Sequence, residues 1–212
     1  MAEPAIFTTA EWGAQPAHTA GFPTESAEGI VVHNTQTTNR NPQSGPPEQE
    51  MAFALARQIQ EDHFARGFAD TGQHFTLSRG GLVLEGRHGS LDAARTGNVI
   101  KGAHAESVGN VANRRFYGIE VEGDNRQEAG GDHVTPEQFS ALVELCAWLS
   151  TQGDFDSQHI VPHNQVLSGH TDCPGLFAAR MGELRTQVHL RKLMMADGAD
   201  PGQAGAEGGS PL

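Results

Sequence analysis

One short stretch near the end of the chain, residues 160–177, constrains the fold and the chemistry more than any other. Its sequence, IVPHNQVLSGHTDCPGLF, places His163, His170 and Cys173 in a loop with Gly and Pro, directly after the apolar pair at 160–161. The apolar pair is typical of the end of a strand, and imidazole with thiolate is a ligand set that suits tetrahedral zinc. A further His elsewhere in the chain would complete a catalytic metal site.

Length and composition favour one domain with tails. At 212 residues the chain is long enough for one well-buried core and rather short for two. A hydrophobic content of 37% with 26 glycines suggests a loop-rich α/β protein. The formal net charge of -12 argues against nucleic acid or an anionic membrane as a partner, because both demand basic patches. We therefore expect a small or uncharged ligand and a monomeric protein.

Cysteine use and the N-terminal sequence indicate the compartment. Cys146 falls inside an apolar helical pattern and Cys173 in a polar loop, so we expect both thiols to be unpaired. The N-terminus has neither a basic segment nor an apolar run of signal-peptide length, and no stretch approaches the roughly 20 apolar residues of a membrane span. We expect a protein that is cytoplasmic at synthesis and has no membrane partner; release or delivery to the cell wall or periplasm stays open.

Hydrophobic periodicity and turn residues predict an alternation of strands and helices. The predicted strands are 29–34, 74–78, 82–85 and 117–121, and the predicted helices are 48–66, 135–153 and 176–195. The helix with the strongest signal begins at a capping box formed by Thr135 and Gln138, with Pro136 at its first position. Residues 86–115 show little periodicity, so a long functional loop with at most one helical turn is predicted there.

The two ends of the chain are predicted to differ from its centre. Residues 1–28 are expected to form an irregular arm that packs on the domain, anchored by Trp12, and residues 29–195 to form the domain itself. Residues 196–212, with the sequence ADGADPGQAGAEGGSPL, are acidic, of low complexity and almost without apolar side chains. We expect this tail to be disordered because it has almost nothing to bury.

Six separated segments occur in the order, and at about the spacing, seen in one enzyme superfamily. They are AEWGAQP, GIVVHNT, DTGQHFTLSRGGLVLEGR, GAHA, YGIEVEG and the pair PHNQV and TDCPG. Together they resemble the zinc-dependent N-acetylmuramoyl-L-alanine amidases of the type 2 amidase and peptidoglycan recognition protein superfamily, over roughly residues 9–180. The resemblance implies that superfamily's α/β (α+β) fold, a mixed central β-sheet flanked by helices, and a peptidoglycan or muropeptide substrate.

The resemblance carries the family's three metal ligands onto His33, His163 and Cys173. Three protein ligands leave a fourth position open, where zinc lowers the pKa of a bound water to about 7 and can polarise a carbonyl. The resemblance therefore implies one Zn2+ per chain. The alternative is a satisfied core histidine at His33 and a buried thiol at Cys173, and the occurrence of all three residues within the matching frame argues against it.

Through the same resemblance, Glu120 aligns with a catalytic glutamate found in the branch that resembles cytosolic anhydro-muropeptide amidases. Strand alternation puts Glu120 and Glu122 on one face of their strand, so one carboxylate can point at the metal. Glu122 is the weaker candidate because it lies nearer the turn at Gly123. The alternative for Glu120 is a solvated acid on an edge strand.

Two departures from the family pattern bear on catalysis. Gln73 stands where many members have a Tyr before the His-Phe pair, and its loss shifts the role of base onto Glu120. Thr171 stands where many members have a Lys that faces the developing oxyanion. Thr occurs at that position in catalytic recognition proteins, and the neighbouring His170 could supply a further donor. The resemblance thus makes Glu120, His170 and Thr171 the catalytic candidates.

The resemblance also indicates residues for substrate contact. His104 and Asn113 align with pocket residues of the family, and Arg87 stands where the family's arginine borders the cleft and could bind a peptide carboxylate. Gln73, in the position of the family's Tyr, joins them as a candidate for substrate contact. The alternative for His104 and Asn113 is that they are ordinary turn residues.

Two classes of function follow from these residues. The first is an amidase that hydrolyses the bond between the lactyl group of N-acetylmuramic acid and L-alanine, with Glu120 as base and then acid. The second is a peptidoglycan-binding module without catalysis. Non-catalytic members of the superfamily typically lack the Cys ligand, and the presence of Cys173 favours the enzyme. A recycling enzyme, a phage endolysin and a secreted effector are all compatible with the sequence.

Overall fold

A mixed β-sheet forms the centre of the computed structural model, which describes residues 2–167, 169 and 171–196. The strands are β1 Ile6–Phe7, β2 Thr24–Ser26, β3 Gly29–Asn34, β4 Phe75–Leu77, β5 Val83–Glu85, β6 Asn98–Ile100, β7 Phe116–Val121 and β8 Ile160–Pro162. Six of them form the main sheet in the order β1-β5-β4-β7-β3-β8, and β2 pairs with β6 in a separate ribbon. Strands β4, β7, β3 and β8 are parallel, whereas β5 runs antiparallel to β4.

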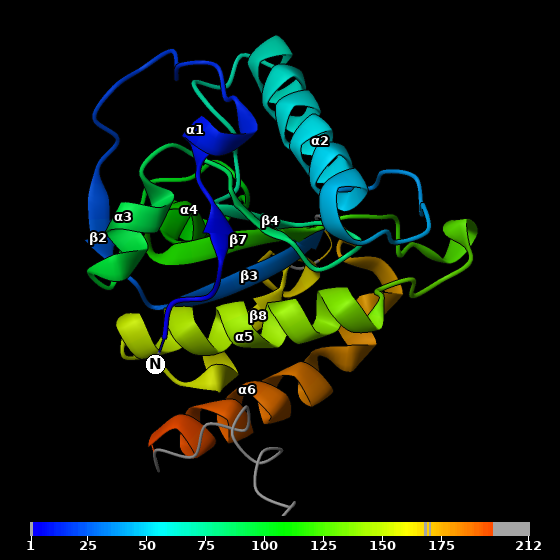
Figure 1. Ribbon diagram of the computed structural model, residues 1–212. Helices are drawn as coiled ribbons and strands as arrows, with labels where there is room; N and C mark the ends of the chain where they lie inside the picture. The colour runs from blue at the N-terminus through cyan, green and yellow to red at the C-terminus, as the bar shows by residue number, and fades with distance from the viewer. Residues whose placement is uncertain (1, 168, 170, 197–212) are drawn as a thin grey trace, which may run out of the picture.

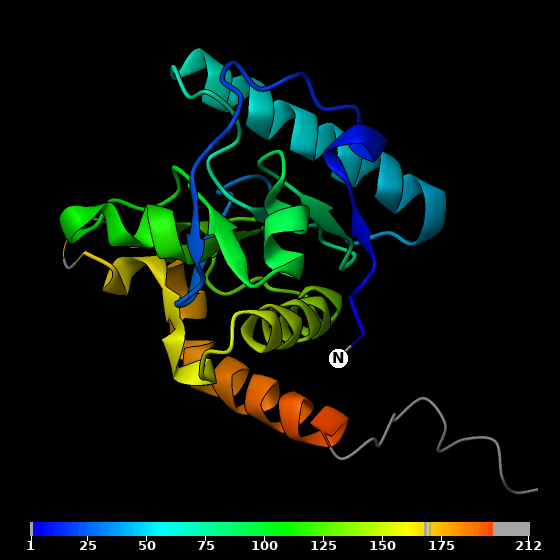
Figure 2. The ribbon, with the colours of Figure 1, turned by 90° about the vertical axis from the view of Figure 1, so that its left-hand side faces the viewer.

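Helices cover both faces of this sheet. They are α1 Thr9–Trp12, α2 Gly45–Ala65, α3 Ser90–Arg95, α4 Val111–Arg115, α5 Pro136–Gln152 and α6 Met181–Ala196, with 3-10 turns at 108–110, 127–129, 157–159, 163–165 and 175–180. Figure 1 shows α2 on one side of the sheet, α5 on the other and α6 beyond α5. Figure 2 shows the same layers after a quarter turn. The arrangement confirms the predicted fold class, a mixed central sheet flanked by helices.

The main core lies between the sheet and α5. On β3 and β7 alternate residues turn their apolar side chains to this side and are fully buried, as strand geometry requires. Helix α5 presents one apolar face to them, and α6 packs on the outside of α5. The core residues that meet here include Ile30, Val32, Ile119, Val121, Leu142, Leu145, Leu149, Leu184 and Val188. The predicted capping box is confirmed, since Thr135 and Gln138 each accept a hydrogen bond from the other's backbone N–H.

The N-terminal segment is more regular than the predicted irregular arm. Its β1 adds a parallel edge strand to β5, and its β2 pairs with β6. Trp12 is the expected anchor: it is 1% exposed, and its indole N–H donates to the backbone oxygen of Glu85 over 2.7 Å. Long-range pairing, which no local pattern in the segment encodes, explains the difference. The proposed boundary at residues 28 and 29 stays a prediction, as do the limits of the domain.

The prediction of one long loop over residues 86–115 is wrong. This stretch contains α3, the strand β6 and α4, and its longest segment outside helix and strand is residues 101–107, between β6 and the 3-10 turn before α4. Strand β6 exists because its backbone pairs with β2, where Val99 lies opposite Glu25. Smaller differences occur elsewhere: α2 begins at Gly45, three residues before the predicted start at Glu48, and the segment predicted as one helix from residue 176 is a 3-10 turn followed by α6.

Both cysteines are buried and unpaired, as predicted. Within residues 2–167, 169 and 171–196, no helix has the length and apolar character needed to cross a membrane. The tail predicted to be disordered lies, from residue 197 on, outside the described residues.

Candidate metal centre

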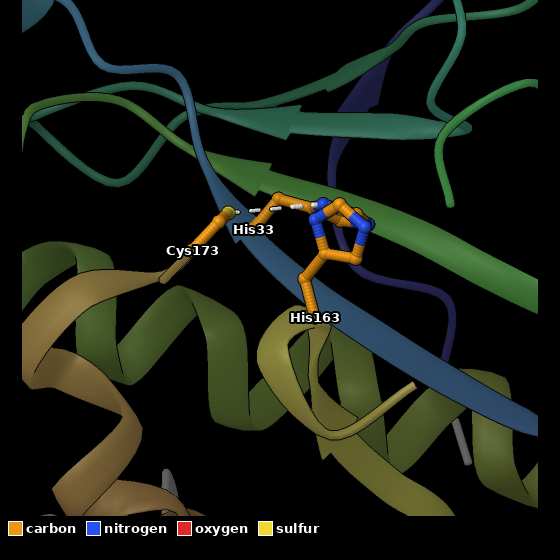
Figure 3. Close-up of side chains that lie close together, drawn as sticks. All are labelled: His33, His163 and Cys173. Atoms are coloured by element: carbon orange, nitrogen blue, oxygen red, sulfur yellow. Dashed lines mark hydrogen bonds between the residues drawn. The ribbon is translucent and has the colours of Figure 1, made fainter. Parts of the chain in front are cut away.

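Three side chains with metal-binding atoms converge at one end of the parallel strands. His33 lies near the end of β3, His163 begins the turn after β8, and Cys173 lies in the loop before α6. One ligand atom from each residue lies within 4.8 Å of the other two, and the Sγ of Cys173 is 3.9 Å from the Nδ1 of His33. Figure 3 shows the three side chains lying close together, with a dashed line from Cys173 to His33.

The topology of the sheet brings these residues together. Strands β3 and β8 are parallel neighbours, so the residues that follow them lie at the same edge. The backbone N–H of Asn164 donates to the backbone oxygen of Cys173 over 2.7 Å, and this bond ties the loop of His163 to the loop of Cys173. The N–H of Asn34 points at the Cys173 sulfur from 3.4 Å. The cluster is therefore held by backbone contacts from all three segments.

The chemistry of the three groups fits a zinc ion. Zinc–nitrogen and zinc–sulfur bonds of the usual length in a tetrahedral site place N and S about 3.6 Å apart, close to the 3.9 Å found between His33 and Cys173. Burial, with smaller contributions from neighbouring histidines, holds the pKa of His33 well below its usual range, so the ring is neutral as a ligand must be. Burial raises the pKa of the Cys173 thiol to about 12. A metal ion would replace that proton on the sulfur.

Glu120 lies beside His33 on the same face of the sheet. The two residues are direct register partners on the parallel pair β3 and β7, and Thr76 of β4 is the partner of Glu120 on its other side. Neighbouring strands are about 4.8 Å apart, so the carboxylate can reach the region in front of His33. Burial raises the pKa of Glu120 to about 7, and the charge of Arg66 opposes this rise. A carboxyl group with such a pKa is suited to accept and return a proton at neutral pH.

Glu122, two residues further on, is committed to other partners. Arg40 donates to both of its carboxylate oxygens over 2.6 and 2.8 Å, and the backbone N–H of Arg79 donates to one of them over 2.7 Å. These bonds hold the carboxylate against Arg40 and the backbone of Arg79. The contrast agrees with the sequence-based preference for Glu120 over Glu122, although the catalytic role itself stays a proposal.

The two other catalytic candidates lie in the loop before Cys173. The hydroxyl oxygen of Thr171 accepts a hydrogen bond from the backbone N–H of Cys173 over 3.1 Å, so Thr171 helps to shape the ligand loop. His170 lies outside the described residues. The proposed contribution of either residue to the oxyanion stays a prediction.

His104 and Asn113 contact the protein itself. The rings of His104 and His33 are hydrogen-bonded between the Nδ1 of His104 and the Nε2 of His33, over 3.0 Å. The side-chain oxygen of Asn113 accepts from the backbone N–H groups of His104 and Ala105 over 2.7 and 3.0 Å. Asn113 therefore fixes the loop that carries His104, and His104 touches a candidate metal ligand.

Gln73 and Arg87 are both buried. The amide nitrogen of Gln73 donates to the hydroxyl of Thr76 over 3.0 Å, which places Gln73 behind the row of Thr76, Glu120 and His33. Arg87 is 3% exposed, and its guanidinium lies 4.4 Å from the ring centre of Phe22 in the N-terminal segment. Neither side chain is exposed to a substrate in this structure, so a direct contact of Gln73 or Arg87 with substrate stays a prediction.

Sequence reasoning missed three residues that shape this site. Thr76 is the register neighbour of Glu120, and Asn34 points its N–H at the Cys173 sulfur. Arg40 holds Glu122 and also Glu48 of α2, with bonds of 2.6 to 2.8 Å. Strand alternation could have placed Thr76 on the correct face, but its pairing with β7 has no signal in the sequence. Arg40 lies in a polar loop, and no signal in the sequence distinguishes it from the other polar residues there.

A groove of about 640 Å³ opens next to the end of β3. Its lining comes from three segments. They are the stretch after β3, with residues 35–38 and Arg40, a face of α2 that includes Gln58 and Asp62, and Glu122. The groove begins two residues after His33 in the sequence. Its walls are rich in hydroxyl and amide groups, as a site for a polar ligand would be.

Comparison with known proteins identifies the family to which the chain belongs. The family model described as N-acetylmuramoyl-L-alanine amidase matches residues 23–176. The chain belongs to this N-acetylmuramoyl-L-alanine amidase family. The family assignment confirms the resemblance inferred from the six sequence segments.

Individual relatives agree with the family. The chain is 33% identical over 110 residues to the endolysin of Enterobacteria phage K11, an alignment that spans 52% of this chain and 64% of the endolysin. The match therefore covers less than two thirds of that relative's length. Wild-type PGRP-LB from Drosophila has a TM-score of 0.63 at 23% identity, covering 83% of this chain and 92% of that one. The amidase LysC from Clostridium intestinale URNW has a TM-score of 0.62 at 24% identity, covering 88% and 99%. The two structures share the fold.

Proposed function

We propose that this protein is a zinc-dependent amidase that hydrolyses the amide bond between N-acetylmuramic acid and L-alanine in peptidoglycan or in muropeptides. The observation that carries the proposal is the position of Glu120, which is in register with His33 of the His33, His163 and Cys173 cluster. A carboxylate beside a cluster of two imidazoles and a thiol is an arrangement suited to metal-assisted hydrolysis. The family of the chain supports the choice of substrate.

The residues of the chain have separate roles in this proposal. His33, His163 and Cys173 would hold one zinc ion, which when bound lowers the pKa of water and polarises a carbonyl group. Glu120 accepts a proton from the attacking water and then donates it to the nitrogen of the leaving L-alanine. Thr171 and His170 are the proposed donors for the oxyanion. The proton that Glu120 takes from the water thus returns to the nitrogen of the amine product.

We propose that the groove beside β3 binds the part of the substrate that adjoins the scissile bond. Its hydroxyl and amide groups from residues 35–38 and Gln58 suit the hydroxyl and peptide groups of a muropeptide. Gln73 donates a hydrogen bond to Thr76, the register partner of Glu120. In this proposal it would hold Thr76 in place beside Glu120 and would not accept a proton itself. The polymeric wall and soluble fragments are both candidate substrates.

The test of this function is product identification. Purified protein is incubated with intact sacculi and, separately, with soluble muropeptides, and the products are analysed by mass spectrometry. We expect free lactyl carboxylate on the sugar and a new amino terminus at L-alanine, lost on chelation and restored by zinc. Cleavage between sugars, or binding to sacculi without any product, would contradict the proposal.

A pair of cysteine variants provides a matched control for the site. Cys173→Ala removes a candidate ligand, whereas Cys146→Ala removes a buried thiol of α5 that lies in the main core. We expect Cys173→Ala to lose zinc and amidase activity, and Cys146→Ala to keep both after correction for the folded fraction. Equal activity of the two variants per folded molecule would exclude Cys173 from the site.

A further inference from the structure

We infer that His104 is a positioning residue for the metal site: it fixes the proton of the His33 ring on Nε2 and leaves Nδ1 as the metal-binding atom. Two consecutive hydrogen bonds connect the cluster to the backbone. The Nε2 of His33 lies 3.0 Å from the Nδ1 of His104, and the Nε2 of His104 lies 3.0 Å from the backbone oxygen of Phe116. The catalytic consequence rests on the proposed function, but the assignment of the proton does not.

The backbone oxygen of Phe116 determines which nitrogen carries the proton in each of these two histidine rings. A carbonyl oxygen can only accept, so the Nε2 of His104 must carry the proton in that bond. In a neutral ring the Nδ1 of His104 is then an acceptor, and the Nε2 of His33 must be the donor. The free lone pair of His33 is therefore on Nδ1, the atom that lies 3.9 Å from the Cys173 sulfur.

The neutrality of the two rings follows from their surroundings. Within the described part of the chain, the nitrogens of His104 bond to His33 and to Phe116, and no carboxylate bonds to its ring. The ring centres of His33 and His163 lie 4.3 Å apart, and those of His74 and His104 lie 5.3 Å apart. A second proton on His104 would place a positive charge among other imidazoles, on a ring whose two nitrogens bond to an imidazole and to a carbonyl oxygen. The neutral pair avoids this cost.

The fold is shaped to seat the His104 ring. A Cβ atom on Gly118 of β7 would lie 2.4 Å from the Cγ of His104, and one on Gly102 would lie 2.9 Å from its Cδ2. No real side chain tolerates the first of these distances, so Gly118 leaves the space that the ring fills. The ring is also fixed from the backbone side, because Asn113 binds the N–H of His104. Its position is thus imposed by β7 and by Asn113 of α4 together.

His74 provides a natural control within the same group of histidines. Its Nδ1 accepts from the N–H of Gly118 over 2.8 Å, and its Nε2 donates to the backbone oxygen of Ile100 over 2.6 Å. Its two nitrogens are satisfied by backbone groups, and neither bonds to a candidate metal ligand. Replacing His74 removes a buried imidazole of the same size without touching the bond between His33 and His104.

The direct test is the tautomer of His33 in the metal-free protein. Long-range ¹H–¹⁵N correlation spectra of protein labelled with ¹⁵N-histidine distinguish a ring protonated on Nε2 from one protonated on Nδ1. We expect His33, His74 and His104 all to carry the proton on Nε2. A proton on the Nδ1 of His33, or a rapid mixture of its two tautomers, would overturn the inference whatever the activity of the enzyme.

Zinc affinity, measured by competition with a chelator, gives the second readout. His104→Phe keeps the ring volume but removes the acceptor, and we expect its dissociation constant for zinc to rise roughly 10- to 100-fold, the usual effect of such outer partners. His104→Asn retains an acceptor near the place of Nδ1 and should recover most of the affinity. His74→Phe should stay within a few-fold of the wild type.

Two results would contradict the positioning role. One is wild-type zinc affinity in a folded His104→Phe protein, and the other is equal loss in His104→Phe and His74→Phe. If His104→Phe does not fold, the tautomer measured in the wild type and the affinity of His104→Asn still decide the matter. None of these measurements uses a muropeptide, so failure of the proposed amidase activity would be recognised separately.

Discussion

The two faces of the central sheet differ in the residues that they present. The face toward α5 is formed by apolar residues such as Val32 and Ile119, which are fully buried. The opposite face carries His33, Glu120 and Thr76 in one row across β3, β7 and β4. The same strands therefore supply stability on one side and reactive groups on the other. We expect substitutions on the two faces to separate into losses of stability and losses of turnover.

Glu120→Gln should give the largest effect on the reactive face. The amide keeps the shape of the carboxylate but cannot accept a proton, so kcat should fall roughly 10²- to 10⁴-fold while zinc affinity and melting temperature are retained. The measurement is kcat per folded molecule with bound zinc and melting temperature determined on the same sample. Unchanged kcat would move the role of base elsewhere, most directly to His170.

Glu122→Gln, directly after the end of β7, is the matched control. It removes the partner of Arg40 and of the Arg79 N–H, so the melting temperature should fall. Its kcat per folded molecule should stay within a few-fold of the wild type, since its carboxylate is held by Arg40 and the Arg79 N–H; because Glu122 also lines the groove beside β3, KM is measured separately. Equal losses of kcat in the two variants would contradict the proposal that Glu120, and not Glu122, acts as the base.

Leu145→Ala is the corresponding change on the apolar face. Leu145 is fully buried between α5 and the sheet, and truncation should cost about 2 to 5 kcal/mol of unfolding free energy. Denaturant unfolding measures this loss, and zinc affinity per folded molecule should be unchanged. A variant with normal stability but weak zinc binding would show that the two faces are not independent.

Glu48→Gln should have a smaller effect that depends on pH. Burial would raise the pKa of Glu48, but hydrogen bonds from Arg40, the Ser78 hydroxyl and two backbone N–H groups lower it from 4.5 to about 2. Because the folded pKa is the lower one, the ionised carboxylate stabilises the protein above pH 4.5, and this contribution is lost as the pH falls toward 2.

The wild type should therefore exceed Glu48→Gln in stability at pH 7 by on the order of 2 kcal/mol, and the difference should shrink as the pH falls toward 2. Unfolding curves at several pH values measure it. Glu50→Gln, an exposed change on the same helix, is the control and should show little difference at any pH. A constant gap for Glu48→Gln from pH 7 to pH 2.5 would mean that its ionisation does not stabilise the fold.

Much of the fold could be predicted because local signals agreed with the final structure. Strand β3 is a β-branched run, and α5 begins with a capping box and Pro136. Strands β2 and β6 could not be predicted, because each is three residues long and exists through pairing with the other across more than 70 positions of sequence. Helix α3 begins at Ser90, and its N-cap residue Gly89 has no side chain to cap it, so it too lacked a start signal.

The candidate site was predictable in its ligand types and unpredictable in its supports. His33, His163 and Cys173 could be proposed from residue types and family motifs, and the structure brings them together. The bond between His104 and His33 depends on a loop folded by Asn113 and on the space left by Gly118. Those contacts arise from packing between distant segments, which spacing in the sequence does not encode.

The most direct test of the metal-dependent amidase is a zinc titration of metal-free protein during hydrolysis of a soluble muropeptide. We expect no turnover without metal and a linear rise that ends sharply at one equivalent of zinc per chain, with L-alanine as the new amino terminus. Full turnover in protein shown by elemental analysis to hold no divalent metal would contradict the assignment of His33, His163 and Cys173 as its catalytic metal site.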